Sequence, residues 1–145
     1  MQLLPDYTMG QHVYTCGAPR FMDGVFEAAV AHGWPQDALH REYFSVPEAD
    51  AWVNQPFELL LQKSGRRLQV PAERSATEVL AEAGVGISVK CSDGLCGVCA
   101  LPYDSQASDA VEHRDFVLSQ KERQHKIILC CSRAQHAGGV ITLNL

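Results

Sequence analysis

Three of the six cysteines lie within nine residues of one another, at Cys91, Cys96 and Cys99, and two more stand side by side at Cys130 and Cys131. This C-x4-C-x2-C spacing with a distant fourth cysteine is that of plant-type 2Fe-2S sites. Two irons share two sulfides and each iron takes two thiolates, so a tight loop supplies three thiolates and a distant cysteine closes the other side. The spacing therefore predicts a 2Fe-2S cluster, which transfers single electrons.

The residues between these cysteines favour the same kind of site. Gly94 and Gly97 stand where the main chain has to pass close to sulfur, and glycine permits the positive φ that such a loop uses. Main-chain N–H groups can then point toward thiolates and sulfides, which raises the reduction potential. The sequence predicts the cluster but not the value of its potential.

The fourth ligand is either Cys130 or Cys131. We expect a strand over residues 126–130, and consecutive side chains of a strand point to opposite faces. Only one of the two thiols then faces the cluster, and the other is a buried free thiol that packs like a small hydrophobic side chain. Spacing does not choose between them.

Other cysteine chemistries fit the pattern less well. Structural zinc sites usually take their ligands as two CxxC-like pairs, whereas here three cysteines cluster and one stands apart. Cys96 and Cys99 form a CxxC, but thioredoxin-type chemistry leaves Cys91 unexplained and expects a strand followed by a helix. A Rieske site needs histidine ligands, and no histidine lies within ten residues of the loop. A zinc-stabilised binding module is retained as an alternative.

Composition narrows the class of protein. The chain has 145 residues and 46% hydrophobic content, enough for a real core, and a formal net charge of −5 with no basic run. We therefore expect no nucleic-acid partner and no membrane partner, since no window approaches the length of a spanning helix. No signal peptide opens the sequence, and crowded cysteines in such a chain indicate a cytoplasmic cofactor site rather than disulfides.

The elements around the cysteine loop predict a small α+β fold. Residues 57–63 and 66–71 form a hairpin split by Ser64 and Gly65. Ser75 and Glu78 make a capping box for a helix that Gly84 ends, and its apolar face covers the hairpin. A short strand over residues 100–103, a brief helix over 119–125 and strands over 126–130 and 140–145 complete a sheet crossed by one helix.

The first 44 residues have a different pattern. Residues 12–18 indicate a strand, residues 19–33 a helix that begins at Pro19 and stops at Gly33, and residues 39–44 a second strand. Residues 45–56 contain two prolines and little periodicity, and we interpret them as a linker. The expected organisation is a strand–helix–strand unit over 1–44, a linker over 45–56 and the cysteine-bearing domain over 57–145.

The stretches VKCSDGLCGVC, EHRDFVLS and IILCCSRA resemble the C-terminal ferredoxin domain of phthalate dioxygenase reductase and its relatives, including vanillate demethylase reductases. The resemblance covers residues 57–145 and implies a β-grasp ferredoxin domain. The family's ligand is followed by one residue and then Ser-Arg-Ala, which selects Cys130. The family's signature between the third and fourth ligands is here expected to pack beneath the cluster loop, and its residues are His113, Arg114, Asp115 and Leu118.

The stretches HVYTCGAPRFMDGV, AHGW and LHREYF are similar to the end of that family's nicotinamide-binding module, except that Ala18 interrupts the usual Cys-Gly-Pro. The resemblance implies that Cys16 and Gly17 lie near the nicotinamide ring and that Phe44 approaches the flavin. Relatives carry an FMN-binding barrel and most of a nucleotide-binding sheet ahead of this point. The chain is therefore expected to be an N-terminally truncated reductase that does not oxidise NADH alone.

Two functions compete. In the first, the chain is the terminal relay of an NADH- and FMN-dependent oxygenase reductase and passes electrons to a Rieske-type aromatic oxygenase or demethylase. In the second, it is a freestanding ferredoxin-like carrier whose N-terminal extension only packs against it. If the first is right, the extension has lost its neighbouring strands. We then expect exposed apolar side chains and low stability in residues 1–44, the side chains in question being Val13, Val25, Phe26, Val30 and Phe44.

Overall fold

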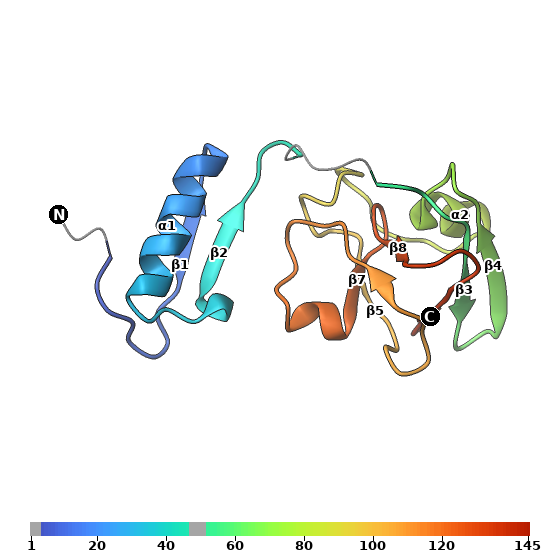
Figure 1. The fold of residues 1–145 in the computed structure, drawn as a ribbon. Coiled ribbons are helices and arrows are strands. Elements are labelled where there is room, and N and C mark those ends of the chain that lie inside the picture. Colours follow the sequence, from blue (N-terminus) through green and yellow to red (C-terminus); the bar gives the residue numbers. More distant parts are fainter. Residues whose placement is uncertain (1–3, 47–51) are drawn as a thin grey trace. The chain divides into compact units, whose positions relative to one another are not determined.

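The computed structural model describes residues 4–46 and 52–145, which belong to two compact units, Met1–Glu48 and Ala49–Leu145 (Figure 1). Residues 47–51 of the expected linker lie outside the described part. No helix among the described residues is long and apolar enough to cross a membrane.

The first unit is a single strand–helix–strand motif, as the sequence predicts. Strand β1 (Val13–Cys16) pairs in parallel with β2 (Leu39–Glu42), and helix α1 (Pro19–Ala31) and the 3-10 turn η1 (Gln36–Ala38) lie between them in sequence. Helix α1 runs alongside both strands (Figure 1). Pro19 starts the helix, where its missing N–H costs nothing, and Gly33 at φ +77° lets the chain leave it.

The core of this unit is small. Ala29, Trp34, Ala38 and Leu39 are buried together, and the indole N–H of Trp34 donates to the carbonyl of Pro5 over 2.9 Å. Val13 and Phe26 pack against this core, which differs from the expectation that they are exposed. Val30 and Phe44 are exposed, as expected, and so are Tyr14 and Phe21.

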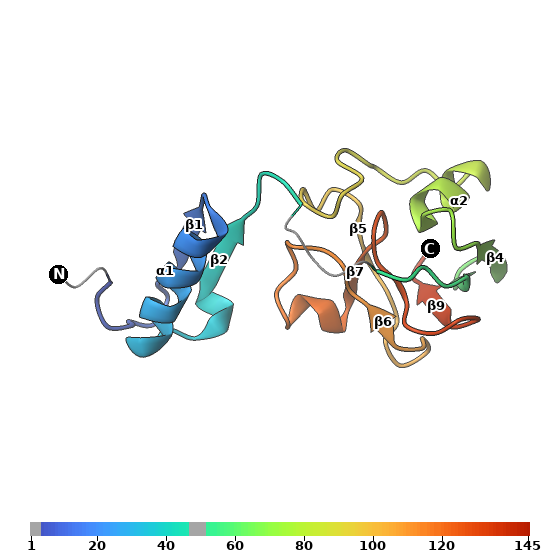
Figure 2. The ribbon, with the colours of Figure 1, turned by 45° about the horizontal axis from the view of Figure 1, so that its top comes forward.

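The second unit is built on a three-stranded mixed sheet. Strand β3 (Phe57–Leu61) is central, with β4 (Arg66–Val70) antiparallel on one side and β9 (Val140–Leu143) parallel on the other. Alternate residues of β3 are buried, because successive side chains point to opposite faces. Helix α2 (Ala76–Glu82) packs against β4 (Figure 2). This mixed sheet with its single helix is a β-grasp, α+β fold, as predicted.

The start of α2 confirms the predicted capping box. The Ser75 hydroxyl accepts the N–H of Glu78, and the Glu78 carboxylate accepts the N–H of Ser75. The apolar face of the helix joins the main core of the unit, whose buried members include Phe57, Leu59, Leu61, Val70, Val79, Leu80, Ile127, Leu129, Ile141 and Leu143.

Two small antiparallel pairs carry the rest of the chain. Strand β5 (Ala100–Pro102) pairs with β7 (Lys126–Ile128), and β6 (Val111–Glu112) pairs with β8 (Arg133–Ala134). The helix expected over 119–125 is only the 3-10 turn η2 (Glu122–Gln124), and the strand expected over 126–130 ends at Ile128. The chain turns there because the N–H of Ser132 donates to the carbonyl of Ile128 over 3.0 Å.

Candidate metal centre

The loop that carries the first three cysteines is an irregular coil with repeated left-handed residues. Gly94 and Gly97 have φ of +75° and +71°, and Ser92 has φ of +63°. The two glycines adopt these angles without a steric penalty, as the sequence suggested. The resulting curl brings main-chain N–H groups toward the inside of the loop.

Cys91 and Cys96 form one pair of thiols at the start of this loop. The N–H of Asp93 donates to Cys91 Sγ over 3.4 Å, and the main chain at Leu95 and Cys96 and the Cys96 thiol also hydrogen-bond to it. Burial raises the pKa of Cys91, but these hydrogen bonds outweigh it and lower that pKa to about 7. The loop thus stabilises a thiolate, the form of cysteine that binds metal.

Cys99 and Cys130 form a second pair. Both are buried beside Ile128, and their thiols hydrogen-bond to each other. The hydrogen bond that the Cys99 thiol donates to Cys130 and burial both raise the pKa of Cys99. The hydrogen bond with Cys131 and burial raise the pKa of Cys130 to about 12, although Cys99 opposes this. These thiols lie where a negative charge is costly unless a cation compensates it.

The two-by-two arrangement of thiols is the main geometric feature of the site. Within residues 4–46 and 52–145, no three His, Cys, Asp or Glu side chains converge closely enough to hold one metal ion. The four thiols instead contact each other as Cys91 with Cys96 and Cys99 with Cys130. A binuclear cluster requires two thiolates at each of two irons.

Cys131 occupies a different place from the one expected. The expectation that Cys130 and Cys131 lie on opposite faces of a strand is wrong, because both follow β7 in a turn and their thiols contact each other. Cys131 Sγ packs beneath the loop, 2.7 Å from the position that a Cβ would take on Gly94. Its sulfur therefore supports the main chain of the loop.

The segment that follows β6, residues 113–118, packs against the same loop, and we call it the shelf. The carboxylate of Asp115 is buried and accepts the N–H groups of Val117 and Leu118 over 3.2 and 2.8 Å. The N–H of Phe116 donates to the carbonyl of Gly94 over 3.1 Å, and the N–H of Arg114 donates to the Ser132 hydroxyl over 3.2 Å. These bonds tie the shelf to the cysteine loop and to the turn after Cys131.

The segment just before β3, residues 52–55, is held by two arginines, Arg114 of the shelf and Arg133 of β8, a feature that the sequence did not reveal. Arg114 lies 5.0 Å from the Trp52 ring and donates to Asn54 Oδ1 and to the Val53 carbonyl. Arg133 donates to the carbonyl of Gln55. The only signal in the sequence was that Arg114 and Arg133 lie within the HRD and SRA stretches.

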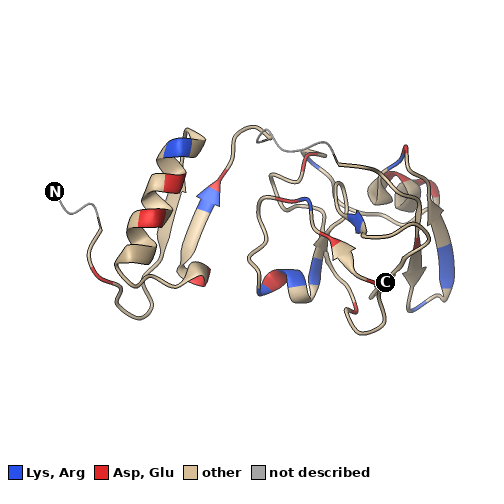
Figure 3. Ribbon diagram, in the orientation of Figure 1, with Lys and Arg blue, Asp and Glu red and all other residues tan. Residues whose placement is uncertain are grey.

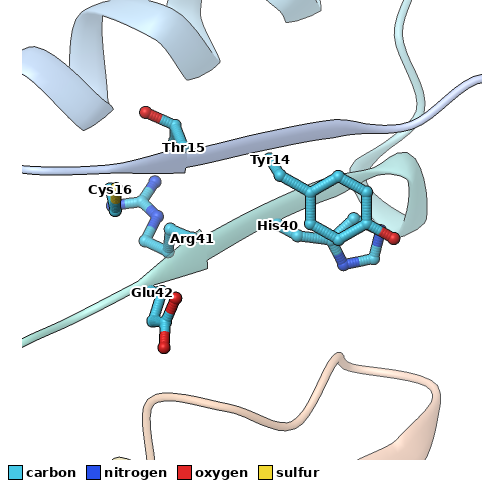
Figure 4. Close-up of a pocket in the computed structure, with 6 residues that line it drawn as sticks. All are labelled: Tyr14, Thr15, Cys16, His40, Arg41 and Glu42. Atoms are coloured by element: carbon cyan, nitrogen blue, oxygen red, sulfur yellow. The ribbon is translucent and has the colours of Figure 1, made fainter.

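Cys16, Gly17 and Phe44 all lie in the first unit. Cys16 lines a hollow of about 300 Å³ along β1 and β2, together with Tyr14, Thr15, His40, Arg41 and Glu42 (Figure 4). The Tyr14 ring stacks on His40 with centroids 4.5 Å apart. Gly17 has φ of +128°, and Phe44 is 75% exposed beyond the end of β2.

Residues 59–135 match the family described as the 2Fe-2S iron-sulfur cluster binding domain. The chain belongs to this family. Membership assigns a 2Fe-2S cluster, and the donor set of the loop fits such a group in number, pairing and main-chain hydrogen bonding.

The chain is also similar to reductases of oxygenase systems. It is 36% identical over 143 residues to the vanillate O-demethylase oxidoreductase of Pseudomonas sp. (strain HR199 / DSM 7063), covering 97% of this chain and 44% of that protein. It is 38% identical over 133 residues to the phthalate dioxygenase reductase of Burkholderia cepacia, covering 92% of this chain and 40% of that protein. The 145 residues thus span less than half the length of these relatives.

A solved structure of phthalate dioxygenase reductase, described as a modular structure for electron transfer from pyridine nucleotides to 2Fe-2S, gives a TM-score of 0.65 at 36% identity. That match covers 95% of this chain and 41% of the solved one. Both units of the chain therefore have counterparts in a reductase. These similarities confirm the predicted resemblance to the phthalate dioxygenase reductase and vanillate demethylase reductase family.

Proposed function

We propose that this chain transfers single electrons through a 2Fe-2S cluster whose ligands are Cys91, Cys96, Cys99 and Cys130. The observation that carries the proposal is the pairing of four thiols within a loop that belongs to a cluster-binding family. Cys91 and Cys96 serve one iron, and Cys99 and Cys130 serve the other. The cluster would supply the one-electron chemistry, while the loop and the shelf fix the positions of the thiolates.

Cys130 rather than Cys131 is the proposed fourth ligand. Cys130 is buried against Cys99, whereas Cys131 lies under Gly94 and hydrogen-bonds weakly to the Ile128 carbonyl over 3.8 Å. The pairing with Cys99 and the family resemblance favour the same residue.

The proposed context is an NADH- and FMN-dependent oxygenase reductase, in which this chain is the terminal relay. NADH releases two electrons together and a 2Fe-2S cluster accepts one, so a flavin is needed between them. The relatives are a vanillate demethylase component and a phthalate dioxygenase component. The proposed electron acceptor is accordingly a Rieske-type aromatic oxygenase or demethylase.

The first unit is proposed to be the C-terminal part of the reductase's NAD-binding domain, spanning residues 1–44, with residues 45–56 as the linker. Cys16 and Gly17 would then lie beside the nicotinamide and Phe44 beside the flavin. The hollow next to Cys16 and the exposed ring of Phe44 are compatible with such ligands. We propose that the 145 residues by themselves do not oxidise NADH, and that the protein is cytoplasmic, where its thiols stay reduced.

The test is the metal content and spectrum of the full chain purified without oxygen. We expect two irons and two acid-labile sulfides per chain and the electron paramagnetic resonance signal of a reduced 2Fe-2S cluster. Zinc, or iron without sulfide, contradicts the proposal and favours the binding-module alternative.

A second measurement separates the relay from a freestanding carrier. Stopped-flow transfer from an FMN-bearing reductase module is compared for the full chain and for a chain with Cys16→Ala, Phe44→Ala and Tyr14→Ala. Slower reduction of the triple variant with an unchanged cluster spectrum supports the relay. Equal rates show that the first unit is dispensable and support the freestanding carrier.

A further inference from the structure

A mostly buried histidine and a fully buried carboxylate face each other beneath the cluster loop. His113 Nδ1 lies 3.8 Å from Asp115 Oδ1, and the side chains are 12% and 0% exposed. Neither of these two atoms has a hydrogen-bond partner among the described residues. The site described above uses the other oxygen, Oδ2, to accept the Val117 and Leu118 N–H groups.

The position of the proton on the His113 ring explains why His113 Nδ1 and Asp115 Oδ1 have no hydrogen-bond partner. The main-chain carbonyl of Arg123 hydrogen-bonds to the ring, and a carbonyl accepts only from a ring nitrogen that carries a proton. In the neutral imidazole the other nitrogen, Nδ1, is then a bare acceptor. A bare acceptor and a carboxylate oxygen face each other with no proton between them, and unpaired buried polar atoms are costly.

One additional proton resolves this mismatch. Protonation at Nδ1 turns two opposed acceptors into a charge-assisted N–H···O pair. Burial holds the pKa of His113 below its ordinary value, and although Asp115 raises that pKa, the positive Arg123 lowers it. Burial thus favours the neutral ring, and a negative charge added nearby would favour the protonated ring.

The cluster loop is close enough to supply that charge. The Cα of Asp115 is 3.1 Å from the position of a Cβ on Gly94, and Phe116, the next residue, bonds to the Gly94 carbonyl. Cys131, which contacts Cys130, also senses the charge of Asp115. We therefore expect a charge added at the cluster to act on this pair.

We propose that His113 and Asp115 form a proton-binding site that takes up a proton when the cluster is reduced. This inference rests on the proposed function. The cluster gains one electron from its donor, and an N–H bond forms at His113 Nδ1 with a proton taken from water, so the added negative charge is compensated. On oxidation the electron leaves to the acceptor and the proton returns to water.

Other titratable and charged groups face the pair but do not replace it. Arg123 Nη2 donates to the main-chain carbonyl of Asp115 over 2.8 Å and lies 3.6 Å from Asp115 Oδ2. Tyr103 packs on His113 with ring centroids 6.2 Å apart, and burial raises the pKa of its phenol. Figure 3 shows that the short helix η2, which contributes Arg123, carries acidic and basic residues side by side.

The first consequence is a pH-dependent reduction potential. Reduction raises the affinity of His113 for a proton, so the potential falls as pH rises between the histidine pKa values of the oxidised and reduced states. Full coupling of one proton to one electron changes the reduction equilibrium tenfold per pH unit, about 59 mV. The midpoint potential of the full chain is measured by mediated titration from about pH 5 to pH 8, and we expect a slope between zero and this limit.

His113→Gln removes the proton-binding nitrogen, and we expect the slope to disappear while the cluster absorption remains. His136→Gln is the matched control, because His136 is an exposed histidine in the loop before β9. The slope of midpoint potential against pH in this variant should equal that of the wild type. A wild-type potential that does not change with pH, or a slope that persists in His113→Gln, overturns the proposal.

Proton uptake by the wild type provides a measurement that needs no variant. The oxidised chain is reduced in weakly buffered solution near pH 6, and an indicator dye counts the protons taken up per electron. Measurable uptake supports the site, and none overturns it. Absence of a 2Fe-2S spectrum in the same sample refutes the proposed function, so the two failures are distinguishable.

Discussion

The sulfur of Cys131 lies 2.7 Å from the position that a Cβ would take on Gly94, and the Cα of Asp115 lies 3.1 Å from the same position. Real Cβ atoms essentially never approach a neighbour to 2.7 Å, and 3.1 Å is tighter than nine in ten of their contacts. Gly94 also has φ of +75°, a left-handed angle that costs other residues roughly 1–2 kcal/mol. Gly94 is thus the point at which the cluster loop, Cys131 and the shelf meet, and only glycine fits there.

We expect Gly94→Ala to lose most of its cluster, because overpacking costs about 1–3 kcal/mol in addition to the backbone penalty. Iron and sulfide content after anaerobic purification measures the effect. Gly86→Ala is the control, since Gly86 precedes the same loop with open space where its Cβ would be. Equal cluster content in the two variants would show that the contact with Cys131 is unimportant.

The two adjacent cysteines should respond differently to substitution. Cys130→Ser removes a proposed ligand and should leave the chain with little or no cluster. Cys131→Ser removes a supporting contact but no ligand, so it should keep most of the cluster and a similar paramagnetic resonance spectrum. The comparison uses iron content and spectra of both variants, and the reverse outcome rejects Cys130 as the ligand.

The elements with strong local signals could be predicted from the sequence. The capping box of Ser75 and Glu78, the glycine stops at Gly33 and Gly84, and the hairpin of β3 and β4 depend on neighbouring residues, and all are present. Strands β6 and β8 have only two residues each and depend on partners distant in sequence, so no local periodicity marks them. Strand β7 stops early because of a turn after Ile128 that the apolar run IILCC conceals.

The site was predictable in its chemistry but not in its surroundings. Cysteine spacing identifies the cluster type, since few spacings allow three thiolates to meet around two irons. The position of Cys131 under Gly94 and the facing pair of His113 and Asp115 arise from tertiary packing. Spacing in sequence carries no information on such contacts.

Arg133 should be one of the largest single contributors to the stability of the second unit. It is 4% exposed, donates to the carbonyls of Gln55, Arg74 and Pro71, and lies 4.9 Å from the Phe57 ring. Arg133→Met leaves three main-chain carbonyls without their donor and removes the buried guanidinium, and we expect a loss of about 2–4 kcal/mol in the free energy of unfolding.

Urea unfolding of the full chain followed at Tyr103 and the cluster absorption measures this loss. Arg67→Met is the control, because Arg67 is exposed on β4 and its ion pair with Glu58 lies at the surface. A loss for Arg133→Met no greater than that of Arg67→Met would contradict the assigned role.

The first unit should exchange its amide hydrogens faster than the second. Only five apolar side chains are buried among its described residues, and Tyr14, Phe21, Val30 and Phe44 remain exposed around a two-stranded sheet, which is marginal by itself. Hydrogen exchange followed by mass spectrometry should show early labelling in α1 and late labelling in β3. Uniform protection of the two units would show that residues 1–44 are independently stable.

Glu122 makes part of the stability of the η2 region depend on pH. Its carboxylate accepts the N–H and the hydroxyl of Ser119, both over 3.0 Å, and the main-chain bond is the largest cause that lowers its pKa. A lowered pKa means that the unfolded chain binds the proton more tightly. The contribution of this carboxylate to stability is therefore complete above the ordinary carboxyl pKa of about 4.5 and is lost as pH falls through the lowered value.

Glu122→Gln should reduce the loss of stability between about pH 5 and pH 3 in urea titrations, whereas Glu27→Gln, on the exposed side of α1, should not. Identical acid profiles for the wild type and Glu122→Gln would rule out this linkage.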